Sequence, residues 1–152
     1  MKKCKAYLES KVGILEIICS ETALEEINFV EAKQNEDENV LSKQVKEQLI
    51  EYFSGERQCF DIPLFLKGTE FQIKVWNELK KIPYGTTVSY KQLAQNIEKP
   101  KAVRAVGSAN GKNKIPIIIP CHRVIGNNGK LSGYAGGTWR KEKLLQIETI
   151  SQ

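Results

Sequence analysis

The first third of the chain carries short runs of apolar and β-branched residues, separated by polar or glycine-containing stretches. This pattern is typical of short β-strands joined by turns. It predicts three strands, over Lys5–Glu9, Ile14–Cys19 and Leu24–Val30, with a turn at 11–13 between the first two. The acidic, polar stretch EAKQNEDEN that follows predicts a loop.

The apolar period then changes from strand-like to helical. Leucine, valine, leucine and phenylalanine recur every fourth residue, at Leu41, Val45, Leu49 and Phe53. This spacing predicts one helix over Val40–Phe53, and Gly55 is a suitable C-terminal stop. The run CFDIPLFL, residues 59–66, predicts one more strand. We place a domain boundary at 67–68, so residues 1–68 form a predicted α/β domain.

The second part, residues 69–152, shows mainly helical signals. Thr69 followed three residues later by Gln72 is a capping box, which marks a helix N-terminus. The apolar residues that follow on one face are Val75, Leu79 and Ile82. Pro83-Tyr84-Gly85 provides turn residues that end this helix.

Two further short helices are predicted in succession. Ser89 with Gln92 forms a second capping box, which opens a helix to about Ile97. Pro100 suits the first turn of another helix, which runs to about Asn110. Two short helices joined by a tight turn are the outline of a helix-turn-helix, although many other helical hairpins share it.

The last of these helices, KAVRAVGSAN, is built almost entirely from small residues. These are Ala102, Ala105, Gly107, Ser108 and Ala109, with one long cation, Arg104, among them. Small residues let a helix backbone approach another surface closely. That surface is either another helix of the same protein or a DNA groove probed by Arg104.

Charge divides the chain in the same place. Residues 1–68 hold 9 basic and 13 acidic residues, a balance of −4, whereas residues 69–152 hold 14 and 5, a balance of +9. A basic half indicates an anionic partner. No stretch is apolar enough for a membrane span or a signal peptide, so we expect a cytoplasmic protein. Four irregularly spaced cysteines are typical of free thiols in a reducing compartment.

Residues 117–126, IIIPCHRVIG, contain the candidate reactive side chains of the sequence. The apolar run 115–119 predicts a buried strand that ends beside Cys121. Ionising a thiol takes a base, and His122 is the only histidine of the chain. Neighbouring side chains of an extended chain point to opposite faces, so unless the chain turns at Pro120 a bridging water is expected between them. A cysteine protease is excluded, because its histidine comes from elsewhere in the fold; a buried, inert cysteine remains the alternative.

The C-terminal stretch WRKEKLLQIE predicts a helix that Thr138 can cap. Lys141, Leu144 and Glu148 lie three and four residues apart and share one face. Glu148 could orient the imidazole and support its cationic form, as the third member of a triad does. A solvated helix with ordinary charges is the alternative.

Three motifs together resemble the O6-alkylguanine-DNA alkyltransferases: PCHRVIG at 120–126, KAVRAVGSAN at 101–110 and GYAGG…KEKLLQIE at 133–148. The resemblance is strongest from about Phe71 to Glu148. It implies a ribonuclease-H-like α/β domain followed by a mainly helical, winged-helix-like domain with a helix-turn-helix. It also implies repair of double-stranded DNA by stoichiometric transfer of a methyl or alkyl group from O6-alkylguanine to the protein.

The resemblance assigns the chemical roles residue by residue. Cys121 accepts the alkyl group, His122 removes the thiol proton through a water, and Glu148 completes the relay. Asn113 ties the helical pair to the active-site segment. The two supporting residues are Tyr90, which crowds a phosphate and hydrogen-bonds N3 of the leaving guanine, and Lys141, which lies near the pocket.

The resemblance also implies how the lesion is reached. Arg104 fills the gap left in the duplex when the base flips out, and Ala102, Ala105 and Gly107 let the helix enter the minor groove. The guanine edge is read by the backbone around Cys121, Val124 and Ala135, and Tyr134 walls the pocket. Ala135 replaces a serine found in some relatives.

A thioether product is stable, so the protein acts once and needs no cofactor. Some relatives bind zinc in the first domain, but Cys4, Cys19 and Cys59 have no histidine beside them, so we expect no metal. We expect a monomer with no membrane partner. The alternative function is a non-enzymatic winged-helix DNA binder or lesion sensor, and the role of Arg123 stays open between structure and phosphate contact.

Overall fold

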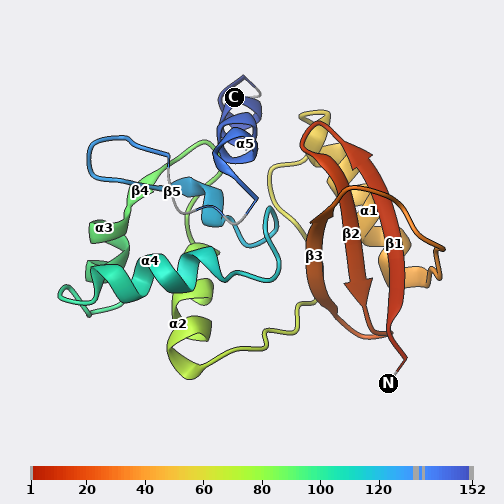
Figure 1. Cartoon of the computed structure of the whole chain (residues 1–152), viewed down its shortest axis with the longest axis horizontal. Coiled ribbons are helices and arrows are strands. Elements are labelled where there is room, and N and C mark those ends of the chain that lie inside the picture. Colours follow the sequence, from red (N-terminus) through yellow and green to blue (C-terminus); the bar gives the residue numbers. More distant parts are fainter. Residues whose placement is uncertain (1, 132–133, 135, 151–152) are drawn as a thin grey trace. The chain divides into compact units, whose positions relative to one another are not determined.

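The computed structural model describes residues 2–131, 134 and 136–150 (Figure 1). The chain divides into two compact units, Met1–Leu66 and Lys67–Gln152. The first unit contains an antiparallel sheet and one helix. The second is mainly helical.

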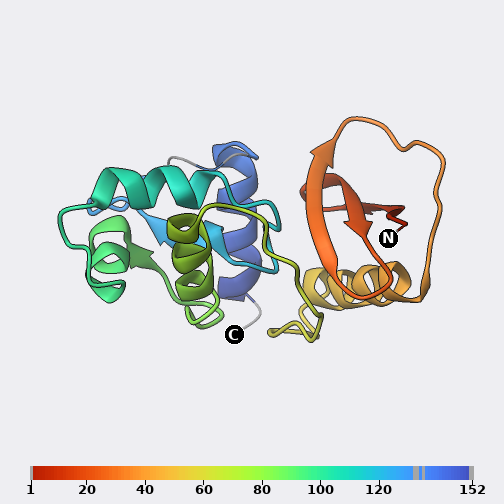
Figure 2. The same cartoon turned by 90° about the horizontal axis from the view of Figure 1, so that it is seen from below.

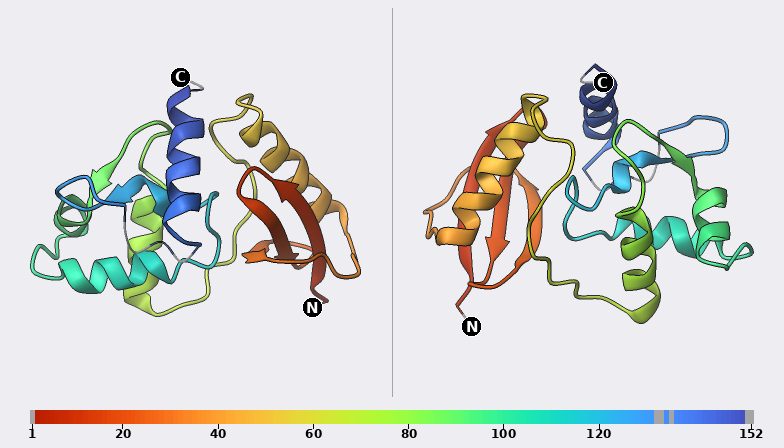
Figure 3. Two further views of the ribbon diagram at one scale, coloured as in Figure 1. Left: turned by 45° about the horizontal axis from the view of Figure 1, so that its top comes forward. Right: turned by 180° about the vertical axis from the view of Figure 1, so that it is seen from behind.

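The sheet of the first unit has the order β1 (Cys4–Ser10), β2 (Gly13–Cys19), β3 (Leu24–Val30), with antiparallel neighbours. Gly13 has a φ of 99°, a value that glycine adopts without strain in the turn between β1 and β2. Helix α1 (Val40–Phe53) lies against one face of this sheet (Figures 1 and 3). The three predicted strands and the predicted helix are confirmed.

Helix α1 has the ends that its sequence favours. The Asn39 side chain accepts a hydrogen bond from the Ser42 amide at 2.7 Å, and the Ser42 hydroxyl accepts one from the Asn39 amide. Leu41, Val45, Leu49 and Phe53 are all buried, as their four-residue spacing predicts. Gly55 has a φ of 85° just beyond the helix, where a left-handed residue satisfies the last carbonyls.

The strand predicted over residues 59–66 is wrong. The segment makes only one isolated bridge, between Leu64 and Leu24, through hydrogen bonds from the Leu24 amide to the Pro63 carbonyl and from the Phe65 amide to the Leu24 carbonyl. Pro63 has no amide hydrogen and cannot continue a ladder. The apolar composition of the segment therefore reflects packing rather than strand pairing.

The second unit begins with three helices that pack on one another, as Figure 2 shows. They are α2 (Glu70–Leu79), α3 (Tyr90–Asn96) and α4 (Val103–Gly111). Trp76 is buried and donates from its indole nitrogen to the Ala109 carbonyl at 2.8 Å, which joins α2 to α4. The other elements are β4 (Val88–Ser89), η1 (Cys121–Arg123), β5 (Val124–Ile125) and α5 (Thr138–Ile150). Strands β4 and β5 are parallel and pair Val88 with Val124.

The helix ends follow most of the predicted signals. The predicted capping box of Thr69 and Gln72 has both of its hydrogen bonds at the start of α2. At α3 only one is present, from the Gln92 amide to the Ser89 hydroxyl. The Gln92 amide group bonds the Asn96 side chain at 2.7 Å instead of returning to the cap. Helix α4 begins at Val103, not at Pro100, and its N-cap Ala102 makes no side-chain cap.

Among the described residues, no helix combines the length and apolar character needed to cross a membrane. Cys4 and Cys19 face each other across β1 and β2, and both are free thiols. Within the described part of the chain, no three histidine, cysteine or acidic side chains come together in a way that could hold a metal ion.

Candidate active site

Consecutive turns, not a strand, carry the chain to Cys121. The predicted strand over residues 115–119 is therefore wrong. The Ile119 amide bonds the Ile115 carbonyl, the Ile118 amide bonds the Pro116 carbonyl, and the Cys121 amide bonds the Ile119 carbonyl at 2.8 Å. Two prolines in this segment remove the amides that a strand ladder needs. The segment is apolar because it is buried, and periodicity alone does not separate these cases.

Two of these turns span only three residues. Pro120 has φ −81° and ψ 64°, which are the angles of an inverse γ-turn. Ile117 lies at the centre of the other turn with a φ of 75°, in the left-handed region that β-branched residues rarely adopt. Such a conformation persists only when its surroundings enforce it. Ile117 is buried, so packing holds this segment in a strained, defined shape.

Cys121 begins the short helix η1, so the chain does turn at Pro120 and the extended geometry is not formed. Its side chain is buried, and burial raises the pKa of the Cys121 thiol to about 11, while the Asn113 side chain and the charge of Lys141 oppose that rise. The Asn113 amide group donates to the Ile119 carbonyl at 2.8 Å, and its oxygen accepts from the Ile115 amide. Asn113 thus connects the segment that follows α4 to the turns.

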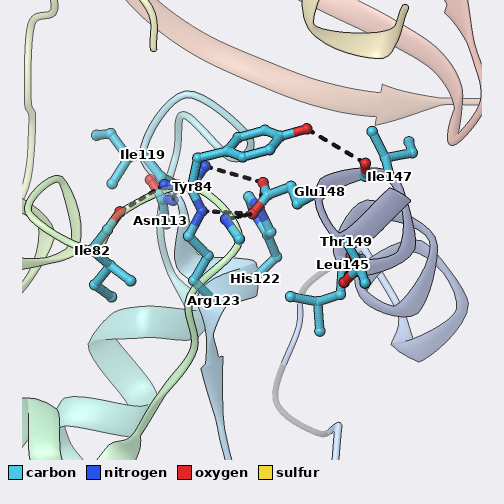
Figure 4. Close-up of polar contacts among 11 residues, drawn as sticks. Ile82, Tyr84, Asn113, Ile119, His122, Arg123, Leu145, Ile147, Glu148 and Thr149 are labelled. Atoms are coloured by element: carbon cyan, nitrogen blue, oxygen red, sulfur yellow. Dashed lines mark hydrogen bonds and ion pairs between the residues drawn. The ribbon is translucent and has the colours of Figure 1, made fainter. Parts of the chain in front are cut away.

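His122 and Glu148 form the predicted pair, and both are buried (Figure 4). His122 Nε2 lies 2.6 Å from Glu148 Oε2. Burial alone would raise the pKa of Glu148, but hydrogen bonds and charges from His122 and Arg123 hold it at about 2. Because the ionised carboxylate only accepts, Nε2 carries the proton of this hydrogen bond.

The opposite ring nitrogen is the chemically available one. Burial lowers the pKa of His122, with Arg123 and Lys141 adding to this effect and Glu148 opposing it. The neutral ring therefore has its lone pair on Nδ1. His122 Nδ1 is buried and has no hydrogen-bond partner in the structure. A buried imidazole nitrogen with a lone pair and no donor is placed to accept a proton.

Arg123 has a structural position, which answers the question that the sequence left open. Its Nε donates to Glu148 Oε1 at 2.9 Å and its Nη2 to Glu148 Oε2 at 3.1 Å. Its Nη1 donates to the Ile82 carbonyl at 2.7 Å (Figure 4). The side chain is buried, so it does not face a phosphate.

Lys141 and Tyr90 form a second cluster beside the thiol. Lys141 lies fully buried on the same face of α5 as Leu144 and Glu148, as predicted. Its Nζ lies 3.5 Å from the Tyr90 hydroxyl and 5.6 Å from the centre of the Tyr90 ring. Burial lowers the pKa of Lys141 and raises that of Tyr90, and the charge of an ionised Cys121 acts on both. These two residues therefore share the electrostatic environment of the Cys121 sulfur.

The small residues of α4 divide between two surfaces. Val106, Ala109 and Asn110 are buried, whereas Arg104, Ala105 and Ser108 are exposed. Ala102 and Gly107 are half-buried, and a Cβ built on Gly107 would lie 3.7 Å from the Tyr90 ring. The helix thus packs inside the unit with one face, and its other face, with Arg104, Ala105 and Ser108, is exposed.

Two of the remaining predicted pocket residues, Val124 and Tyr134, are among the described residues. Val124 is buried, and its amide already donates to the Cys121 carbonyl. Tyr134 is buried, and burial raises its pKa well above the ordinary value, with Cys121 adding to the rise. Ala135 lies outside the described residues.

Besides the bonds of Arg123, three further contacts of this site were not predicted from the sequence. The Asn110 side chain donates to the Cys121 carbonyl at 3.3 Å. The Gly85 amide donates to Glu148 Oε1 at 3.3 Å, and the Tyr84 hydroxyl donates to the Ile147 carbonyl at 3.4 Å. Asn110 could have been noticed, because it is a polar residue four positions after Val106 on the apolar face of its helix. Nothing in the local sequence signals the other two.

Family models match almost the whole chain. Residues 3–66 match the 6-O-methylguanine DNA methyltransferase ribonuclease-like domain, and residues 70–150 match the DNA-binding domain of the same family. The chain belongs to the 6-O-methylguanine DNA methyltransferase family. The resemblance found in the sequence motifs is thereby confirmed, and so is the order of a sheet domain followed by a helical domain.

Several members of this methyltransferase family align with long stretches of the chain. A methylated-DNA–protein-cysteine methyltransferase of Methanosarcina acetivorans is 48% identical over 151 residues, covering 94% of this chain and 96% of its own. The constitutive enzyme of Bacillus subtilis is 57% identical over 109 residues, covering 71% and 66%. The crystal structure of Mycobacterium tuberculosis O6-methylguanine methyltransferase superposes with a TM-score of 0.91 at 40% identity, covering 99% and 95%. A complex of M. tuberculosis OGT with DNA gives 0.88 at 42% identity, covering 95% and 92%.

Proposed function

We propose that this protein repairs alkylated DNA by transferring a methyl or alkyl group from O6 of guanine to Sγ of Cys121. The observation that carries the proposal is the buried cluster of Cys121, His122 and Glu148 in a chain of this family. The names of its relatives, which are methylated-DNA–protein-cysteine methyltransferases, support the same reaction.

The reaction exchanges one bond for another. The sulfur attacks the alkyl carbon, a carbon–sulfur bond forms, and the bond from that carbon to O6 breaks with its electron pair going to guanine. The thiol proton passes to His122 Nδ1 through one water. The departing guanine anion takes a proton from water, and the imidazolium then returns its proton to the solvent, so the proton count balances. Glu148 stabilises the imidazolium during this step. The thioether is stable, so each molecule reacts once and needs no cofactor.

The surroundings of the thiol fit such a reaction. A thiol whose pKa is about 11 is un-ionised at rest, so the base has to act in the transition state. Lys141 supplies positive charge near the sulfur. Tyr90, whose pKa is raised by burial, keeps its hydroxyl proton and can donate to N3 of the leaving guanine. Asn113 holds the turns that carry the sulfur.

DNA recognition is proposed for the exposed face of α4. Helices α3 and α4 form the helix-turn-helix of a winged-helix-like domain, and α4 enters the minor groove of double-stranded DNA. Ala102, Ala105 and Gly107 allow close approach, and Arg104 occupies the space of the flipped O6-alkylguanine. The exposed position of Arg104 and the +9 balance of residues 69–152 support this. Tyr134 and the backbone at Val124 line the base pocket in this proposal.

We further infer that the protein works as a monomer in the cytoplasm, with no metal. Stoichiometric repair by a single polypeptide requires no second subunit, and the four free cysteines fit a reducing compartment.

The test is transfer of label from DNA that carries O6-[methyl-³H]guanine. We expect one label per protein molecule on Cys121, and none with Cys121→Ser. Cys59→Ser, which removes an exposed thiol from the other unit, is the matched control and should be labelled fully. If the wild-type chain binds the damaged DNA and never takes up label, it is instead a non-enzymatic lesion sensor.

A further inference from the structure

The carboxylate of Glu148 is saturated with donors. It accepts at least four hydrogen bonds: two from the Arg123 guanidinium, one from His122 Nε2 and one from the Gly85 amide. A carboxylate has about four lone-pair directions. His122 therefore shares Glu148 with a permanent cation, in a bidentate geometry that is among the strongest for an arginine.

This sharing changes what a histidine–carboxylate pair does. An ionised carboxylate alone beside an imidazole favours the imidazolium, with protons on both nitrogens. Such a ring has no lone pair and is not a base. Arg123 is always charged and balances the negative charge of Glu148. Lys141, on the same face of α5 as Glu148, adds further positive charge near the ring.

We propose that Arg123 is a positioning residue that keeps His122 a neutral base, with its proton on Nε2 and its lone pair on Nδ1. This inference rests on the proposed alkyl transfer for its purpose, but the state of His122 can be measured without it. Nδ1 is the ring nitrogen nearer to the main chain, and it is the atom that is buried without a partner.

The Arg123 guanidinium, whose Nε and Nη2 form a fork on Glu148, also contacts two other residues. Nη1 donates to the Ile82 carbonyl at 2.7 Å, and the guanidinium carbon lies 5.6 Å from the centre of the Tyr84 ring. These contacts fix the plane of the guanidinium, so that Nε and Nη2 both point at Glu148. A lysine ammonium is a single point of charge and cannot reproduce this arrangement.

The first experiment uses the fact that the chain has a single histidine. Protein labelled with ¹⁵N-histidine gives one imidazole, whose two nitrogen shifts report the tautomer and the charge across a pH titration. In the wild type we expect a neutral ring at pH 7 with the proton on Nε2. In Arg123→Met the midpoint should move to higher pH, because Glu148 then acts on the ring alone.

Two controls separate this from loss of charge or of fold. Arg57→Met removes another arginine that bonds a carboxylate, Glu51 at 2.8 Å, in the other unit, and should leave the His122 titration unchanged. In Arg123→Lys, which keeps the charge, the midpoint should lie between wild type and Arg123→Met. Full restoration by lysine would overturn the role of the fork. An unchanged midpoint in Arg123→Met, or a wild-type proton on Nδ1, would overturn the proposal.

A rate measurement then connects this state to chemistry. Transfer from free O6-benzylguanine to Cys121 should fall about tenfold per pH unit below the raised midpoint in Arg123→Met. The wild-type rate should stay level over the same range. If the wild type transfers no alkyl group, the proposed function fails, while the NMR titration still decides the role of Arg123.

Discussion

The turns at residues 115–123 and the exposed face of α4 lie in the same unit but are built in opposite ways. The turns are buried, contain two prolines and a strained isoleucine, and are held by side-chain bonds from Asn110 and Asn113. The α4 face consists of small side chains and one exposed arginine.

The difference matches two physical demands. A proton relay needs atoms fixed to within a fraction of an ångström and shielded from water, which a buried, over-determined segment provides. A surface for a duplex needs access and closeness, which small exposed residues provide. Substitutions in the two regions should therefore affect different steps.

The largest effect is expected from Glu148→Gln. The amide cannot stabilise an imidazolium, so alkyl transfer should slow by about 10²-fold or more, on duplex DNA and on free alkylguanine alike. The His122 midpoint, and with it the acidic limb of the pH–rate profile, should also move to lower pH, because the charge of Glu148 no longer raises the His122 pKa. Single-turnover kinetics with both substrates measure this, and Glu142→Gln, an exposed position of the same helix, is the control. A loss confined to duplex DNA would assign Glu148 to binding instead.

The next largest effect is expected on the acid stability of the unit that holds the buried pair of His122 and Glu148. The folded pKa of Glu148, about 2, lies below its ordinary 4.5, so its contribution of about 3 kcal/mol is present above pH 4.5 and is lost as pH falls toward 2. The lowered pKa of His122 acts in the same direction, since stability falls as pH drops below 6.5.

Denaturation by urea at pH 7 and pH 3, followed by tryptophan fluorescence, measures this effect. Both tryptophans, Trp76 and Trp139, lie in the second unit, so the signal reports the unit that holds Glu148. Glu148→Gln should show a smaller loss between the two pH values than the wild type. Equal losses would mean that Glu148 does not carry the acid sensitivity.

The same contrast explains what could be predicted from the sequence. Strands β1 to β3 and helix α1 follow local periodicity and caps, and they lie where the pattern places them. The run 115–119 is just as apolar, but its path depends on Pro116, on Pro120 and on a bond from Asn113. Burial makes a segment apolar whether it is a strand or a series of turns.

The site shows the same limit at the level of single residues. The spacing of Lys141, Leu144 and Glu148 predicted one shared helix face but not that it is buried, and the pairing of His122 with Glu148 was predicted from the family resemblance. The role of Arg123 was not, since its partners Glu148 and Ile82 lie 25 and 41 residues away. Only the folded chain shows that the guanidinium points inward.

On the α4 side, Arg104→Ala should slow repair of duplex DNA by about tenfold or more and leave the reaction with free alkylguanine unchanged. The physical reason is that extruding a base from the duplex costs a few kcal/mol, and without Arg104 in the gap the base returns to the stack more readily. Lys74→Ala, which removes an exposed cation from α2, controls for net charge. Equal losses on both substrates would remove the proposed role of Arg104 in the duplex.

The smallest effect is expected from Gly107→Ala, and it has opposite signs for folding and for repair. The added Cβ would meet the Tyr90 ring at 3.7 Å, an ordinary contact, and alanine favours a helix interior by up to about 1 kcal/mol. Thermal stability should therefore rise slightly, while binding to duplex DNA weakens if this face approaches the groove. Melting curves and duplex titrations on one preparation measure both. If binding is unchanged while stability rises, Gly107 serves neither packing nor DNA approach. It would then not belong to the exposed α4 face that we propose to contact DNA.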